Sequence, residues 1–133
     1  MSALLYAHSG IRYLVLLAGA LTILYGVFGW ATKRPYDDHI KRLGLAFAGL
    51  IDLQLLMGLL IILSGSFYPA LIGHVMVMVF AAVAAHLPVA VMKRRPPEQR
   101  TFAPYAAWAI VALVLIWGGV LSIGRSMFGM GVS

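Results

Sequence analysis

Four long apolar runs dominate this chain of 133 residues. Residues 13–31, 71–92 and 102–124 contain no Asp, Glu, Lys or Arg, and residues 43–63 contain only Asp52. Each run is close to the ~20 residues that a helix needs to cross a bilayer. The strands of a membrane barrel would alternate apolar and polar residues, and these runs do not alternate. The sequence therefore predicts an all-α fold, an integral membrane four-helix bundle.

The predicted helices cover residues 3–31, 43–64, 70–92 and 102–124, and together they form a single transmembrane domain, residues 1–133. The composition is 62% hydrophobic and only 11% charged, far from the ~25% charged residues of a soluble domain. A soluble globular enzyme is therefore excluded. The sequence has no cysteine, which excludes disulfides, thiolate zinc sites and iron–sulfur clusters.

Basic residues predict the orientation of the helices. Eight of the ten Lys and Arg residues lie in two connections, 32–42 and 93–101, and the connection 64–70 has none. Cytoplasmic loops are rich in Lys and Arg, so we expect both basic connections inside and both termini on the outer, periplasmic side. This topology accounts for the net charge of +6 without nucleic acid. The expected location is the bacterial inner membrane, as a multi-pass protein.

Ionisable residues within membrane spans are candidate functional residues. At ~1.5 Å per helical residue, His8, Arg12 and His74 lie towards the outer ends of the first and third helices. Two imidazoles from different helices are a common ligand set for haem iron. We therefore predict His8 and His74 as the metal ligands of one haem b, with Arg12 as the partner of a propionate. Met78, one turn from His74, would pack on the porphyrin or replace one imidazole. Histidines that bind only water or headgroups are the alternative.

A second polar group lies nearer the cytoplasmic ends of the helices. Asp52 and His86 are at similar depth, and we predict that they form a buried pair in which each reduces the desolvation cost of the other. With Gln54, such a pair could carry protons or bind a quinone carbonyl. A second haem held by His86 and His39 is a further alternative, although His39 lies in a basic connection, where a solvated histidine is expected.

Three stretches and one further histidine resemble a known pattern. They are His8-Ser9-Gly10-Ile11-Arg12-Tyr13, then Leu53-Gln54-Leu55-Leu56-Met57-Gly58, then His74 with Met78, and finally His86 ahead of a Lys/Arg cluster. This order resembles small four-helix bacterial membrane proteins labelled cytochrome-b-like, over roughly residues 8 to 95. The resemblance implies b-type haem binding in an electron-transfer setting. In that pattern a histidine often precedes the Leu-Gln run, where this chain has Asp52.

The expected function is that of a haem b-binding electron-transfer protein, either a small cytochrome or a subunit of a larger redox complex. No catalytic residues are predicted, and an electron carrier is favoured over a stand-alone enzyme. Two alternatives remain: a cofactor-free structural or assembly subunit, and a quinone- or proton-handling protein that uses Asp52 and His86. The expected partners are the lipid bilayer and a respiratory or other redox complex or a second copy of the chain.

Overall fold

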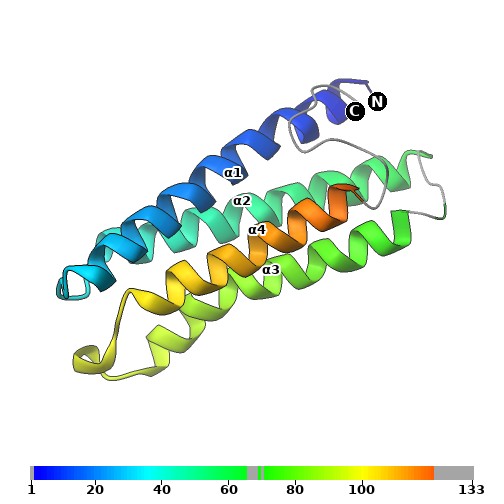
Figure 1. Ribbon diagram of the computed structural model, residues 1–133. Helices are drawn as coiled ribbons and strands as arrows, with labels where there is room; N and C mark the ends of the chain where they lie inside the picture. The colour runs from blue at the N-terminus through cyan, green and yellow to red at the C-terminus, as the bar shows by residue number, and fades with distance from the viewer. Residues whose placement is uncertain (1, 66–68, 70, 122–133) are drawn as a thin grey trace.

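The protein is a bundle of four long helices (Figure 1). The computed structural model describes residues 2–65, 69 and 71–121. The helices are α1 (Ser2–Ala31), α2 (Asp38–Leu63), α3 (Leu71–Arg94) and α4 (Ala103–Leu121), and a short 3-10 turn, η1 (Pro97–Gln99), precedes α4. All four helices are long and apolar enough to cross a membrane. The predicted all-α membrane four-helix bundle is confirmed.

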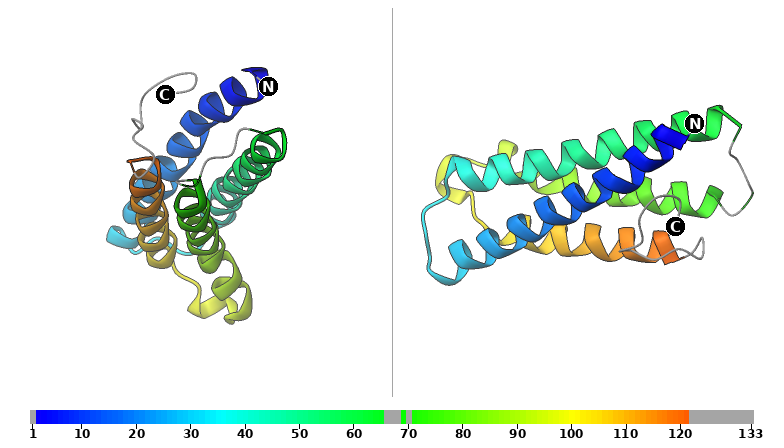
Figure 2. Two further views of the ribbon diagram at one scale, coloured as in Figure 1. Left: turned by 90° about the vertical axis from the view of Figure 1, so that its right-hand side faces the viewer. Right: turned by 90° about the horizontal axis from the view of Figure 1, so that it is seen from above.

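The helices form a ring in chain order, in which α1 packs on α2, α2 on α3, α3 on α4, and α4 back on α1. The backbones of α2 and α4 also approach each other across the ring, whereas no Cα atoms of the described parts of α1 and α3 lie within 8 Å of each other. Figure 2 shows the four helices from two further sides. Both basic connections lie at one end of the bundle, here called the basic end; α1 begins and α4 ends at the other (Figure 1). This opposite end, which carries His8 and His74, is called the histidine end.

Large apolar side chains cover the outside of the bundle. Leu24, Leu63, Phe80 and Val114, one from each helix, are 67%, 72%, 60% and 58% exposed. A soluble protein would not leave so much contiguous apolar surface in water. The exposed faces therefore suit the acyl chains of a bilayer, in agreement with the predicted lipid environment.

One helix boundary differs clearly from the prediction, because α2 begins at Asp38 rather than at residue 43. Asp37 caps the helix, since its carboxylate accepts a hydrogen bond from the backbone N–H of Ile40 at 3.0 Å. An aspartate at this position satisfies an otherwise unpaired helical N–H group and stabilises the first turn. The charged residues Lys41 and Arg42 thus lie within the helix and not in the connection before it.

Small residues allow the helices to approach closely, as small residues do in membrane bundles. The main core holds alanines from α3 and α4, among them Ala81, Ala85 and Ala112, all at most 2% exposed. Between α1 and α4, a Cβ atom placed on Gly26 would lie 3.2 Å from the backbone nitrogen of Ala106. The backbones of the first and last helices are therefore in near contact at this level.

A second, aromatic cluster closes the basic end. Tyr105 of α4 is 1% exposed, and its hydroxyl is 2.7 Å from that of Tyr36 in the first connection. Phe102 lies edge-on to Tyr25 of α1, with ring centroids 5.5 Å apart. This cluster joins the connection after α1 to the start of α4, which are far apart in the sequence.

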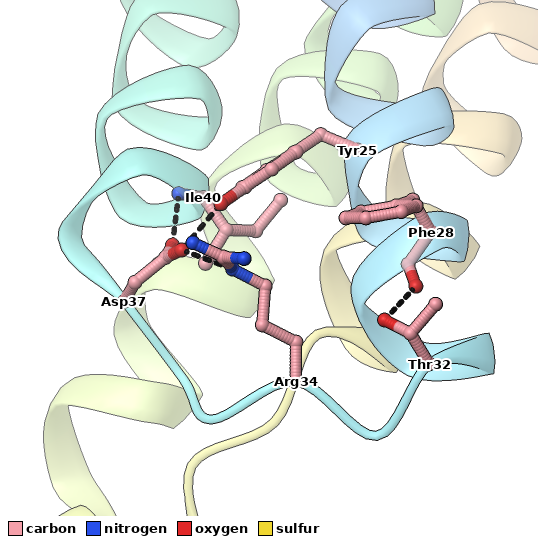
Figure 3. A network of polar contacts seen from close by, with 6 residues as sticks. All are labelled: Tyr25, Phe28, Thr32, Arg34, Asp37 and Ile40. Carbon is pink, nitrogen blue, oxygen red and sulfur yellow. Dashed lines mark hydrogen bonds and ion pairs between the residues drawn. The ribbon is translucent and has the colours of Figure 1, made fainter.

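A polar network beside this cluster fixes the first connection (Figure 3). The Asp37 carboxylate accepts hydrogen bonds from the Tyr25 hydroxyl, the Ile40 N–H and Arg34 Nε, the last at 3.1 Å. Partial burial of the carboxyl opposes its ionisation, but these three donors outweigh that effect and hold the pKa of Asp37 below its ordinary value of 3.8. The network therefore favours the ionised carboxylate.

This network predicts acid sensitivity. Because the pKa of Asp37 is lower in the folded state, its contribution is present above pH ~4 and is lost as the pH falls through the lowered pKa. Between pH 6 and pH 3, the melting temperature of the native protein in detergent micelles should fall further than that of Asp37→Asn. Asp38→Asn, an exposed neighbour in the first turn of α2, is the control and should follow the native curve. Parallel curves for all three proteins would contradict the prediction.

Candidate functional site at the histidine end

The polar residues of α1 lie on a single face near its start. Ser9 and Arg12 are buried, at 9% and 8% exposed, and His8 is half-buried. Residues one turn apart on a helix share a face, so Arg12 lies directly below His8. The Arg12 guanidinium lies over the ring of Tyr13, 5.3 Å from its centroid. An arginine buried within a membrane helix is costly, which marks this face as a candidate site.

His8 lies against α2. Gln54 Nε2 donates a hydrogen bond to the backbone carbonyl of His8 at 2.8 Å. A Cβ atom on Gly58 would lie 3.7 Å from His8 Cε1, so this glycine provides the surface on which the imidazole rests. Two atoms, His8 Nδ1 and Gln54 Oε1, are buried and make no hydrogen bond of standard geometry in the described part of the chain, although the two side chains lie beside each other. A buried polar atom of this kind is expensive unless something binds it.

His74 is anchored to α4. Its Nδ1 lies 2.8 Å from the backbone carbonyl oxygen of Gly119, and a carbonyl can only accept, so Nδ1 carries the proton. A metal-binding histidine typically donates its other N–H to a backbone carbonyl or a carboxylate. In this tautomer the Nε2 atom of His74 keeps its lone pair and is the atom able to bind iron.

The two histidines interact across the bundle. His8 and His74 come from α1 and α3, the helices on opposite corners of the ring, and His8 interacts electrostatically with both His74 and Arg12. The structure thus brings together three of the predicted site residues at one end. In four-helix bundles, cofactor sites are built in this way from side chains on facing helices.

Met78 shares the α4-facing side of α3 with His74. A Cβ atom on Gly119 would lie only 2.7 Å from Met78 Cε. The thioether end of Met78 thus rests on the same glycine whose carbonyl accepts the hydrogen bond of His74. This places Met78 in the packing between α3 and α4, next to the predicted site.

The donor set suits a haem better than a bare metal ion. In the described residues, no three His, Cys, Asp or Glu side chains gather in a way that could hold a metal ion. Haem iron needs only two protein ligands, and two imidazoles from separate helices are present. The buried His8 Nδ1 and the oriented His74 both fit an imidazole-ligated group, and Arg12 supplies a positive charge beside it.

Asp52 and His86 form the second predicted pair, between α2 and α3. His86 Nε2 lies 2.8 Å from Asp52 Oδ2 and 3.0 Å from Oδ1. The pair was expected to be buried, but the two side chains are 51% and 50% exposed on the outside of the bundle. The reason is helical phase: Asp52 follows the buried Ile51 on α2, and His86 follows the buried Ala85 on α3. Both therefore point to the outer edge of the contact between these helices.

Two other predicted residues lie away from this pair. Gln54 bonds to the His8 carbonyl and so belongs to the histidine end. His39 lies edge-on to Tyr25, with ring centroids 6.4 Å apart, and lines an apolar surface groove of about 390 Å³ between α1 and α2. His39 thus lies on the side of α2 that faces α1, whereas His86 contacts α2 at Asp52, on the side that faces α3.

The Gly119 carbonyl is an element of the site that the sequence did not indicate. A backbone acceptor has no side-chain signature, and α4 contributes no ionisable residue to the histidine end. The sequence does contain the Gly118-Gly119 pair, and small residues of this kind indicate that another helix approaches α4 closely. Of the two, only Gly119 is in contact with α3, since a Cβ atom on Gly118 would meet nothing within 4 Å.

No family model, curated protein or solved structure matches the chain.

Proposed function

We propose that the protein binds one haem b at the histidine end, with His8 and His74 as the iron ligands, and that it transfers electrons within the membrane. The observation that carries this proposal is the hydrogen bonding of the two imidazole rings. His74 has one ring nitrogen fixed by the Gly119 carbonyl, and His8 Nδ1 is buried without a hydrogen bond of standard geometry, although the Gln54 side chain lies beside the His8 ring. An interfacial histidine that met only water or headgroups would not need either arrangement.

Each residue of the site has a defined part in this proposal. The Gly119 carbonyl holds the His74 ring in one tautomer, and Gln54 fixes the backbone of α1 at His8. Arg12 supplies a buried positive charge that suits a propionate carboxylate. Apolar side chains around the bundle exclude water, and the low dielectric constant that results strengthens the electrostatic interaction between Arg12 and a carboxylate. Bound haem would supply the chemistry, which is one-electron reduction and oxidation of iron.

An absorption spectrum tests the proposal directly. The full chain is purified in mild detergent from cells supplied with a haem precursor, and the spectrum is taken before and after reduction with dithionite. Sharp α and β bands in the reduced protein, with about one haem per chain, support the proposal. A chain that is folded and helical by circular dichroism but lacks these bands contradicts it and favours the cofactor-free subunit.

A quinone site built from Asp52, Gln54 and His86 has less support. These three residues lie in two places, because Gln54 bonds to the His8 carbonyl while Asp52 and His86 bond to each other. An electron carrier also needs a donor and an acceptor. We therefore propose that a larger respiratory or other redox complex is the partner of the histidine end, where the haem would lie.

We propose further that the basic end faces the cytoplasm of a bacterial cell and that the histidine end faces outward, as basic connections do. The native chain has no cysteine, so single cysteines report position cleanly. Ser64→Cys, at the exposed end of α2, should react with an impermeant maleimide in intact spheroplasts. Glu98→Cys, in the exposed η1 turn, should react only after the membrane is opened. The reverse pattern would invert the topology.

A further inference from the structure

The Asp52–His86 pair lies in an unusual place for a membrane protein. It is half-exposed on the outer surface of α2 and α3. Leu56 and Val83, one helical turn from Asp52 and His86, are apolar and 54% and 51% exposed. At ~1.5 Å per residue, Asp52 lies ~15 Å along α2 from Arg42, and His86 lies ~10 Å along α3 from Lys93. Both residues are therefore well inside a hydrocarbon core of ~30 Å.

Such a pair cannot face acyl chains without a large cost, because nothing in hydrocarbon satisfies its remaining polar atoms. The hydrogen bond between the two residues uses only His86 Nε2, and His86 Nδ1 has no partner within the described part of the chain. The carboxylate oxygens of Asp52 also keep lone pairs beyond their two contacts with His86 Nε2. A covering surface must therefore offer both an acceptor and a donor.

A second copy of the chain offers both groups. The pair has no net charge either as carboxylate with imidazolium or as carboxylic acid with neutral imidazole, and in both forms His86 Nδ1 carries a proton. Each copy thus exposes one N–H donor and one carboxyl acceptor. In a two-fold interface the same patch meets itself, so His86 Nδ1 of each copy can donate to Asp52 of the other.

Membrane geometry favours the same arrangement. Two copies with the same orientation in the bilayer are related by an axis along the membrane normal, and such a rotation preserves depth. Asp52 and His86, which already meet at one depth, therefore meet again across that axis. Close approach is possible because Gly49 is exposed one turn from Asp52, where an added Cβ atom would meet nothing within 4 Å. Ala90 is likewise small and exposed, one turn from His86.

We propose that the outer surface of α2 and α3 around Asp52 and His86 is a homodimer interface, with reciprocal hydrogen bonds from His86 Nδ1 to the partner carboxylate. This inference does not depend on haem binding. It predicts that the protein is a dimer in the bilayer and that α4 faces lipid on the outside of the dimer.

Cross-linking of the full chain in membranes tests the interface without altering the pair. Val83→Cys lies one turn from His86, and Val114→Cys on α4 is the matched control, because both native valines are exposed, 51% and 58%. Copper phenanthroline should give a disulfide-linked dimer with Val83→Cys and none with Val114→Cys. Cross-linking through Val114 alone, or of Val83 to a protein of different mass, would overturn the proposal.

Variants of the pair test its role. Asp52→Leu and His86→Leu remove the acceptor and the donor; measured by energy transfer between labelled copies diluted in lipid vesicles, each should weaken dimerisation about tenfold, the effect of two membrane hydrogen bonds. The exchanged double variant, Asp52→His with His86→Asp, preserves the reciprocal pattern and should restore most of the affinity. Circular dichroism confirms that each variant folds. Dimerisation that is unchanged in both single variants overturns the proposal, as does a native protein that is monomeric in the vesicles, with or without a bound quinone.

Discussion

Replacing His8 or His74 with alanine is expected to abolish the low-spin haem spectrum of the purified protein. Each substitution would remove one of the two proposed iron ligands, which come from different helices, and haem retention should fall at least tenfold, because a ligand bond to iron and its supporting contacts would be lost together. The measurement is the reduced-minus-oxidised spectrum with the haem-to-protein ratio. Helical content by circular dichroism separates loss of ligand from loss of fold.

His86→Ala is the matched control for this prediction. His86 is on the same helix as His74 but ~18 Å further along it, and it bonds to Asp52 rather than to any residue of the histidine end. Its removal should leave the haem spectrum intact. If the haem survives both His8→Ala and His74→Ala, or is lost only in His86→Ala, the assignment of the ligands is wrong and the pair on α2 and α3 is the place to look.

The largest expected effect on stability comes from Gly29→Ala. A Cβ atom at this position would lie 2.3–2.5 Å from three ring atoms of Phe102, which is 2% exposed and packed between Tyr25 and Tyr36. A rigid ring in a filled core has no room to move aside. Overpacking of this kind costs roughly 1–3 kcal/mol, so the melting temperature in detergent should fall by several degrees.

Gly118→Ala is the control for this change. It makes the same substitution in α4, but its added methyl group meets nothing within 4 Å. Alanine is the better helix former by up to ~1 kcal/mol, so this variant should be as stable as the native protein or slightly more stable. Equal losses in the two variants would show that the cost is not the contact with Phe102.

The fold was predictable because a membrane-spanning helix is defined by a run of ~20 apolar residues, and such runs can be read directly from the sequence. The start of α2 was not predicted, since hydropathy marks where charged residues begin and not where the helical backbone begins. Lys41 and Arg42 interrupt the apolar run, yet Asp37 caps the helix before them and extends it. Recognising Asp37 as an N-cap would have moved the boundary.

The candidate site was predictable to the extent that it rests on side chains. The depth of His8, Arg12 and His74 follows from counting residues along helices, and the structure brings these residues together. Counting also placed Asp52 and His86 at one level, where they bond. Which side of a helix faces the core is harder to judge in a membrane, because lipid-facing and core-facing residues are both apolar. The exposure of that pair was missed for this reason.

The contact of α4 with α1 has a consequence for how the protein is made. Gly26 of α1 is covered by Ala106 of α4, Gly29 of α1 is covered by Phe102 in the connection just before α4, and the Tyr36 hydroxyl reaches that of Tyr105. During synthesis, α1 enters the membrane well before α4 is translated, so these surfaces of α1 face lipid until α4 is inserted. Insertion of α4 completes the ring of helices. A chain truncated before α4 would leave the α4-facing surfaces of α1 and α3 uncovered, and we expect membrane proteases to degrade it faster than the native chain.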